Sequence, residues 1–279
     1  MAVWGRDIPW RQGHVLPDDA VKAFGLSTDT TTSVLAIVVS HDCDLAQDPS
    51  VEPRAEIIVG HRIATADGNF TYAKNARRLH LTFSGGGEHL TADLVASCKS
   101  TVVKDQLAEY EPVENVKLTL IEGNILQRWL AARYRRAAFP DEFDRRLERT
   151  GIRDRLGKIL KSAGTSIAAI YFDVDKGQDI PRAEDDDPYT LAIYLLFSTE
   201  TDPESAEQAA EAAKQKIKNA FREKCSSKET GTWHDIQLIA CEVISDQAMT
   251  VQQAETLKRW SADHISLRTE TPQAMLRDE

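Results

Sequence analysis

Cysteine is scarce in this sequence, and the few cysteines form no pattern typical of a disulfide framework or a zinc site. The 279 residues contain four of them, with no CxxC pair, at Cys43, Cys98, Cys225 and Cys241. Cysteine pairs at short spacing are typical of structural zinc, and dense frameworks are typical of small secreted domains. We therefore expect free thiols in a reducing cytoplasm and a core that folds without disulfide bonds.

Long hydrophobic runs are also lacking. The longest apolar stretches, near 34–39 and 191–197, have the length of strands, whereas a membrane-spanning helix needs about 20 apolar residues. The first residues do not show the apolar run of a signal peptide after a basic start. These absences predict a cytoplasmic protein that has no membrane partner.

Complete catalytic and nucleotide-binding motifs are absent as well. The sequence has no GxSxG, HExxH, EF-hand or zinc-finger pattern. Its glycine-rich segment, Ser84–Glu88, lacks the lysine of a phosphate-binding loop and the spacing of a dinucleotide fingerprint. Any functional site must therefore be sought in smaller clusters of charged and polar residues.

The charge is unevenly distributed along the chain. The formal net charge is −10, which disfavours broad, non-specific binding to nucleic acid or anionic membranes. Residues 1–123 carry 11 basic and 17 acidic side chains, residues 124–163 carry 11 and 5, and residues 164–279 carry 12 and 22. A basic central segment thus separates two acidic parts, so a local basic site remains compatible with the acidic total.

The hydrophobic patterns predict an α+β fold in which residues 1–123 form a β-rich domain, a small barrel or curved sheet. The apolar run 34–39 predicts a strand buried on both faces. Further strands are expected at 56–63, 70–72, 79–83 and 116–120, with a hairpin turn at Asp67-Gly68.

Residues 124–163 predict a linker of basic helices, which begin after Asn124, after Pro140 and near Ile152. Residues 164–267 predict an α/β sandwich domain in the order β-β-α-β-α, in which Asp202 and Thr250 cap the two helices. The polar tail 268–279 is expected to be flexible.

The first candidate site is the sequence Ser-His-Asp-Cys-Asp at 40–44, directly after the buried strand. One hypothesis is a Cys43 nucleophile with a His41 base, although the flanking carboxylates would disfavour the thiolate. Another is a metal bound by His41, Cys43 or Asp44, with the ligand set completed by His61, His80 or Cys98. A third alternative is a turn in which these groups are structural. We take His41, Cys43, Asp44 and His61 as the candidate catalytic residues.

The second candidate is the carboxylate pair Asp173 and Asp175 at the end of a predicted strand. Residues at i and i+2 of a strand share a face, and two such carboxylates can hold Mg²⁺ or Mn²⁺ for phosphoryl chemistry. The alternative is that the strand end is acidic because it is solvated.

The third candidate is the basic segment itself, where arginines can bind the phosphates of a nucleotide or nucleic acid. The alternative is that acidic neighbours in the same helix, or the acidic part that follows, neutralise them. The candidate ligand-binding residues are Arg135, Arg136, Arg145, Arg146 and Arg149.

Taken together, these features predict a binding or regulatory protein with a local basic site for a phosphate-bearing ligand, either a nucleotide or a nucleic acid, or for a partner protein. A further possibility is that the protein self-associates through the C-terminal sheet. The alternative is a metal-dependent hydrolase or nuclease that uses His41, Cys43 and Asp44, or Asp173 and Asp175, with a divalent metal as cofactor.

Overall fold

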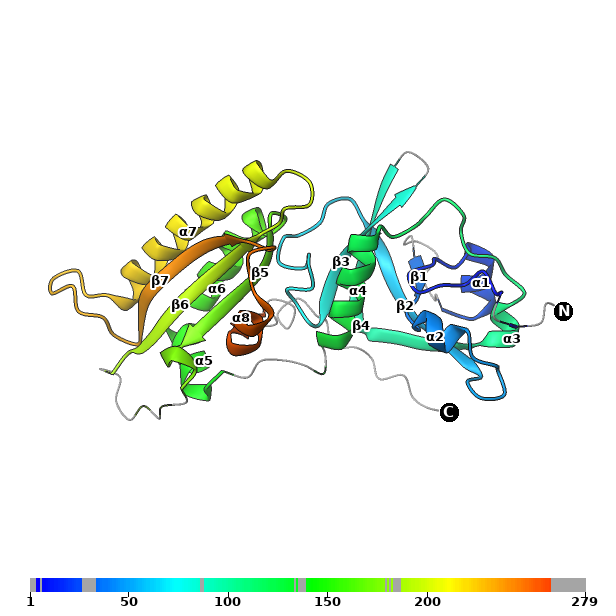
Figure 1. Cartoon of the computed structure of the whole chain (residues 1–279), viewed down its shortest axis with the longest axis horizontal. Helices are drawn as coiled ribbons and strands as arrows, with labels where there is room; N and C mark the ends of the chain where they lie inside the picture. Colours follow the sequence, from blue (N-terminus) through cyan, green and yellow to red (C-terminus); the bar gives the residue numbers. More distant parts are fainter. Residues whose placement is uncertain are drawn as a thin grey trace. The chain divides into compact units, whose positions relative to one another are not determined.

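A computed structural model describes residues 4–5, 7–26, 34–85, 88–132, 134, 139–178, 180, 182 and 187–261. The chain divides into two compact units (Figure 1). The N-terminal unit consists of Met1–Ala66 and Ala76–Tyr134, and the C-terminal unit consists of Asp67–Asn75 and Arg135–Glu279. The predicted α+β fold with a β-rich N-terminal part is confirmed. None of the described helices is long and apolar enough to cross a membrane.

The N-terminal unit is built on a curled, four-stranded antiparallel sheet in the order β1-β2-β4-β3. Its strands are β1 (Val34–Val38), β2 (Arg54–Ile63), β3 (Arg78–Gly85) and β4 (Glu88–Val103). Residues 35–38 of β1 are all buried, as the uninterrupted apolar run predicted, because both faces of this strand meet apolar side chains.

Short helices and loops complete this unit. The short helices are α1 (Asp18–Ala23), α2 (Asp42–Leu45) and α3 (Lys104–Leu107), and α4 (Leu120–Ala132) packs against β3. Trp10 lies fully buried in a core with Ala36, Val38 and Ile57 from the sheet. Its indole N–H donates to the carbonyl of Leu107 at 3.1 Å, so α3 is tied to the same core.

Three local predictions in this part of the chain are wrong. Residues 70–72 form turns, because Tyr72 and Ala73 adopt positive φ angles of 53° and 55° that no strand has. Residues 116–120 contribute a single bridge, from Lys117 to Ser84, before α4 begins at Leu120 rather than after Asn124. Asp67-Gly68 makes no hairpin, since β2 pairs with β4 instead of β3.

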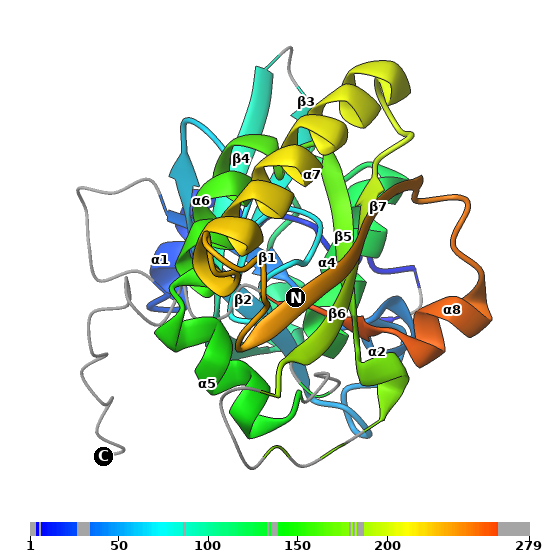
Figure 2. The ribbon, with the colours of Figure 1, turned by 90° about the vertical axis from the view of Figure 1, so that its left-hand side faces the viewer.

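The C-terminal unit carries helices against a second sheet, in the order β7-β6-β5-β8. Its strands are β5 (Ile167–Val174), β6 (Tyr189–Phe197), β7 (Ile236–Ser245) and the short β8 (Lys258–Arg259). β5 and β6 are antiparallel, and the long helix α7 (Pro203–Cys225) returns the chain so that β7 is parallel to β6. With α8 (Val251–Thr256), the predicted order β-β-α-β-α is confirmed (Figure 2).

The basic segment 124–163 is divided between the two units. Its first helix, α4, belongs to the N-terminal unit, whereas α5 (Asp141–Arg149) and α6 (Ile152–Ala163) belong to the C-terminal unit. Pro140 precedes α5 as predicted, and Phe143, Leu147 and Leu156 join the same core as the strands. The caps by Asp202 and Thr250 are both present. The tail predicted at 268–279 lies outside the described residues.

Residues 67–75 belong to the C-terminal unit, although the residues that precede and follow them in the sequence belong to the N-terminal unit. Gly68 lies against Gly164 at the end of α6 so closely that a Cβ on Gly164 would be 2.3 Å from the Gly68 carbonyl oxygen. Lys74 is buried and donates to the carbonyls of Gly164 and Ile167 at 2.5 and 2.6 Å. This segment is therefore an integral part of the α6–β5 region.

Candidate anion-binding site

Two helices of the C-terminal unit form the walls of a basic groove. Helices α6 and α7 pack side by side on one face of the sheet (Figure 2). Each buries an apolar stripe at helical spacing, and the polar residues beside these stripes border the gap between the helices. We call this gap the α6–α7 groove; it is a cavity of about 270 Å³ lined by Arg155, Lys158, Ile159, Ser162, Lys216 and Asn219.

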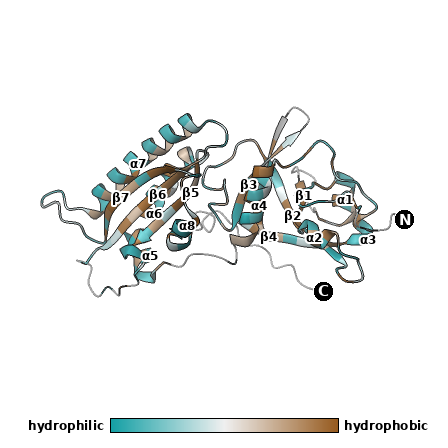
Figure 3. Cartoon of the chain, viewed as in Figure 1, coloured by the Kyte–Doolittle hydropathy of each residue, from teal (hydrophilic) through white to brown (hydrophobic). Residues whose placement is uncertain are grey.

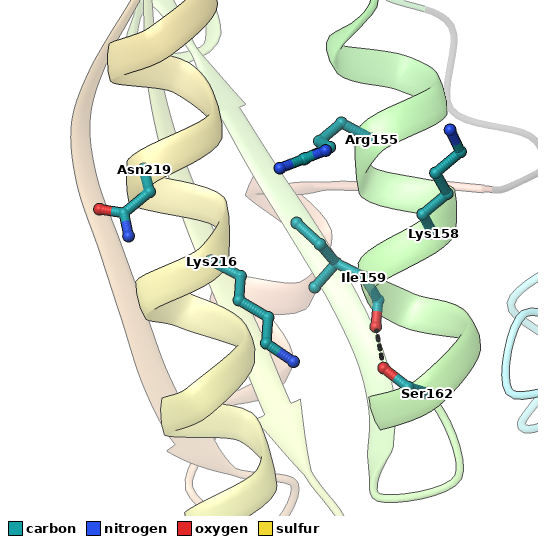
Figure 4. A pocket seen from close by; sticks show the side chains of 6 residues that line it. All are labelled: Arg155, Lys158, Ile159, Ser162, Lys216 and Asn219. Carbon is teal, nitrogen blue, oxygen red and sulfur yellow. Dashed lines mark hydrogen bonds between the residues drawn. The ribbon is translucent and has the colours of Figure 1, made fainter.

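The side chains of the groove place cations around a small apolar floor. Arg155 and Lys216 point into the gap from opposite helices, and Ile159 lies between them (Figure 4). Lys158 and Asn219 point away from the centre of the gap. The Ser162 hydroxyl donates to the Ile159 carbonyl at 3.0 Å, and its oxygen can still accept a hydrogen bond.

The cations of the groove differ from most of their neighbours in lacking carboxylate partners. Arg153 pairs with Glu148 at 2.7 Å, Lys161 with Asp67 at 3.7 Å, and Lys214 with Glu211 at 3.0 Å. Within the described ranges, Arg155, Lys158 and Lys216 form no ion pair, and no acidic residue lines the groove. Three unneutralised cations around one cavity repel each other, and a bound anion would relieve this repulsion.

The loop 40–44 is held by structural hydrogen bonds. His41 caps α2, because its Nδ1 accepts from the Cys43 N–H at 3.2 Å. Asp42 accepts from the Gln12 N–H at 2.8 Å, and the Asp44 carbonyl accepts from the Lys104 ammonium at 2.6 Å. Cys43 is exposed rather than buried. The loop has the contacts of a tight turn.

His61 lies away from that loop. It pairs with Val34 at the start of β1, whereas the loop 40–44 follows the end of β1. Along an antiparallel pair this separation amounts to about 20 Å. The structure therefore does not bring His61 together with His41, Cys43 and Asp44, and no three His, Cys, Asp or Glu side chains gather as a metal site among the described residues.

His61 instead shares a row of the sheet with Asp93 of β4 and His80 of β3. Asp93 is buried and accepts two hydrogen bonds from the Arg78 guanidinium, at 2.7 and 2.5 Å, while His80 Nε2 lies 3.4 Å from the same carboxylate. Burial alone would raise the pKa of Asp93, but the hydrogen bonds from His80 and Arg78 lower it to about 2.

The low pKa of Asp93 predicts how the stability of the protein depends on pH. Because the folded pKa is about 2 and the ordinary value is 3.8, the ionised carboxylate stabilises the fold above pH 3.8, and this contribution is lost as the pH falls towards 2. Its size is about 2 kcal/mol. In denaturant titrations, Asp93→Asn should lower the free energy of unfolding at pH 7 and flatten its decline between pH 4 and pH 2. An unchanged acid profile would contradict this role.

The two carboxylates at the end of β5 separate in the structure. The chain leaves the strand after Val174, and Asp175 adopts a positive φ of 49° in the 3-10 turn η1 (Asp175–Gly177). Asp175 is buried; one carboxylate oxygen accepts from Arg182 at 2.6 Å, and the other accepts from the N–H and hydroxyl of Thr190. Asp173 remains half-buried on β5. Because Arg182 already neutralises Asp175, the pair does not form a shared cation site.

The arginines chosen from the sequence fall into three environments. Arg135 and Arg136 lie outside the described residues. Arg145 is exposed and pairs with Glu142 at 3.0 Å, and Arg149 donates to Asp235 at 2.8 Å. Arg146 is buried, and its guanidinium bonds Glu142 and the backbone carbonyls of residues 187 and 235. These three are engaged within the C-terminal unit.

Comparison of the chain with known protein families, with curated proteins and with solved structures found no match.

Sequence reasoning missed the groove, although part of its signal was present. Arg155, Lys158 and Ser162 recur at i, i+3 and i+7, a spacing that places them on one face of a helix. Lys216 and Asn219 show the same i, i+3 spacing. Lys216 and Asn219 lie more than fifty positions after Ser162, however, and only the tertiary structure decides which helix packs beside α6. The spacing therefore predicts one polar face on each helix, but it does not predict that the two faces lie next to each other.

Proposed function

We propose that this protein binds a small phosphate-bearing ligand in the α6–α7 groove, in keeping with a binding or regulatory role rather than with an assembled catalytic centre. The observation that carries the proposal is that Arg155 and Lys216 point into one cavity from opposite helices, while Lys158 lies on its border and no carboxylate is found among the described residues that line it. Guanidinium and ammonium groups are the usual partners of phosphate oxygens.

The size of the groove favours a compact ligand. Its volume is about 270 Å³, just below the range of small-molecule pockets, which begins at roughly 300 Å³. One phosphate can be contacted from both helices, and Ile159 offers a small apolar surface for the rest of the molecule. Ser162 and Asn219 add neutral hydrogen-bonding groups.

The surroundings of the groove favour a small ligand over a nucleic-acid strand. The C-terminal unit carries 22 basic and 28 acidic residues, so its net charge is −6. An extended polyanion would be repelled wherever it left the groove. Among the described residues that line the groove, none is aromatic, so bases find no side chain to stack on. A mononucleotide or another small phosphate ester fits these conditions better.

Calorimetric titration of the full chain with inorganic phosphate and with AMP at low ionic strength tests the proposal. We expect saturable binding that weakens as salt is added, because screening reduces the attraction between exposed charges. Lys216→Glu and Arg155→Glu should each weaken binding by about tenfold or more. A single-stranded oligonucleotide should bind more weakly than AMP.

A matched control is Lys228→Glu, which makes the same change in net charge at an exposed lysine outside the groove. It should leave the affinity for AMP within about twofold of the wild type. The proposal fails if the wild type shows no binding of either probe at low salt. It also fails if Lys228→Glu weakens binding as much as Lys216→Glu, because the effect would then come from net charge.

A further inference from the structure

The outer edge of the C-terminal sheet is formed by a long strand. β7 has ten residues and is the first strand in the order β7-β6-β5-β8. Within the part of the chain that the structure describes, no strand pairs with its outer side. An edge strand presents a row of backbone N–H and carbonyl groups that can pair with another strand.

This edge carries little of the protection that sheet edges usually have. β7 contains no proline, lysine or arginine, and Glu242 is its one charged residue. Ile239, at a bulge in the register with β6, is 51% exposed. After the bulge, residues 240–245 pair with β6 without interruption. Charges and prolines are the features with which proteins commonly prevent edge pairing, so the stretch 240–245 is suited to accept a further strand.

The helix that covers β7 carries a stripe of charges beside this edge. Lys214 of α7 lies 3.6 Å from the Glu242 carboxylate of β7. Burial raises the pKa of the Cys241 thiol to about 12, and Lys218 and Lys214 act in the opposite direction, which places both amines near β7. Helical spacing extends this row in both directions. We call it the edge stripe; it consists of Glu207, Glu211, Lys214, Lys218 and Arg222.

The edge stripe changes sign along its length. Its N-terminal members, Glu207 and Glu211, are acidic, and its C-terminal members, Lys218 and Arg222, are basic. A two-fold rotation about an axis near Lys214 reverses the direction of the stripe. Each acidic half then faces the basic half of the other copy. The stripe is thus complementary to itself, as the surface of a two-fold interface must be.

We propose that this protein forms a two-fold symmetric dimer in which the β7 strands of two copies pair antiparallel and the two α7 edge stripes lie beside each other. The two parts of this surface differ in hydropathy, since β7 is mainly hydrophobic and α7 mainly hydrophilic (Figure 3). Pairing joins the sheets of the two copies into one continuous sheet.

The proposed interface is separate from the α6–α7 groove. Lys216 and Asn219 lie on the side of α7 that faces α6, whereas the edge stripe lies on the side towards β7. Dimerisation would leave the groove open, so failure of one proposal does not imply failure of the other.

Light scattering and sedimentation of the full chain over a series of concentrations test the dimer. We expect a species of twice the 31.1 kDa chain mass. Ile239→Lys introduces a charge at the exposed edge and should weaken the dimer by about tenfold or more. The matched control is Val251→Lys, the same kind of change at a 76% exposed residue of α8, which should leave the dimer intact.

Charge reversal in the edge stripe distinguishes this dimer from other modes of association. Lys218→Glu places like charges together across the two-fold axis and should weaken the dimer by about tenfold. The double variant Glu211→Lys/Lys218→Glu restores opposite charges across the interface and should recover most of the affinity. A monomeric wild type, a dimer insensitive to Ile239→Lys, or a double variant no better than Lys218→Glu would each overturn the proposal.

Discussion

Replacement of Arg146 by alanine is expected to lower the free energy of unfolding of the C-terminal unit by about 3–5 kcal/mol. The side chain is 1% exposed, and its guanidinium donates to Glu142 at 3.0 Å and to the carbonyls of Asp187 and Asp235 at 2.8 and 3.2 Å. It also lies over the ring of Tyr189, 5.2 Å from the ring centre. Truncation removes these donors and leaves a cavity next to a carboxylate that has lost a partner.

The neighbouring arginine provides a matched control. Arg145 pairs with the same residue, Glu142, at the same 3.0 Å, but its side chain is 71% exposed. An exposed ion pair contributes roughly 0–1 kcal/mol, since both charges remain solvated. Arg145→Ala should therefore change the free energy of unfolding by no more than about 1 kcal/mol.

Denaturant titration gives the two values, and hydrogen exchange of the peptides that cover α5 and β6 locates the effect. Arg146→Ala should accelerate exchange in both elements, because its side chain connects them. Equal stabilities of the two variants would show that the buried guanidinium is not the structural link described above. Arg146 would then again be a candidate for binding an external phosphate.

Lys74→Ala is expected to cost about 3 kcal/mol of stability, because it removes the buried donor that closes the end of α6. The ammonium donates to the carbonyls of Gly164 and Ile167 and to the hydroxyl of Thr71. Burial, with repulsion from Arg259, holds the pKa of Lys74 well below its usual value. The three oxygen acceptors offset this cost of burying the amine.

Lys161, in the last turn of α6, serves as the control for Lys74. Lys161 reaches the Asp67 carboxylate at 3.7 Å, yet its side chain is 71% exposed. Lys161→Ala should cost no more than about 0.5 kcal/mol. Hydrogen exchange should show faster opening of the last turn of α6 and the start of β5 in Lys74→Ala alone. If exchange there is unchanged, the segment 67–75 does not hold this region.

Local sequence signals predicted the C-terminal unit well. The Asp202–Pro203 start of α7 and the capping box at Thr250 and Gln253 involve residues only three positions apart, so the chain contains the whole interaction within one short window. Strands β5 and β6 are largely apolar runs, which sequence patterns identify directly, whereas the charged pair of β8 gives no such signal. The order β-β-α-β-α follows from these signals.

The N-terminal unit was harder to predict because its strands depend on distant partners. β4 was missed: its residues mix small, polar and charged side chains, and Asp93 interrupts the apolar pattern. The Asp93 carboxylate is stable in this buried position because Arg78 of the neighbouring strand β3 donates hydrogen bonds to it. Arg78 lies two residues before His80, which is the cross-strand partner of Asp93. Conversely, Phe70–Tyr72 alternates like a strand, but Lys74 and Gly68 draw this segment into turns against α6.

By itself, the sequence determined that this is an α+β chain in which a basic segment at 124–163 separates two acidic parts. Only the tertiary structure decided which of those basic residues remain available to a ligand. Arg149 is neutralised by Asp235, which lies 86 positions away, whereas Arg155 lines the same groove as Lys216 of another helix, with no carboxylate among the described residues that line it. The reason is physical: charges attract or repel according to distance in space, and the packing of α6 against α7 sets that distance.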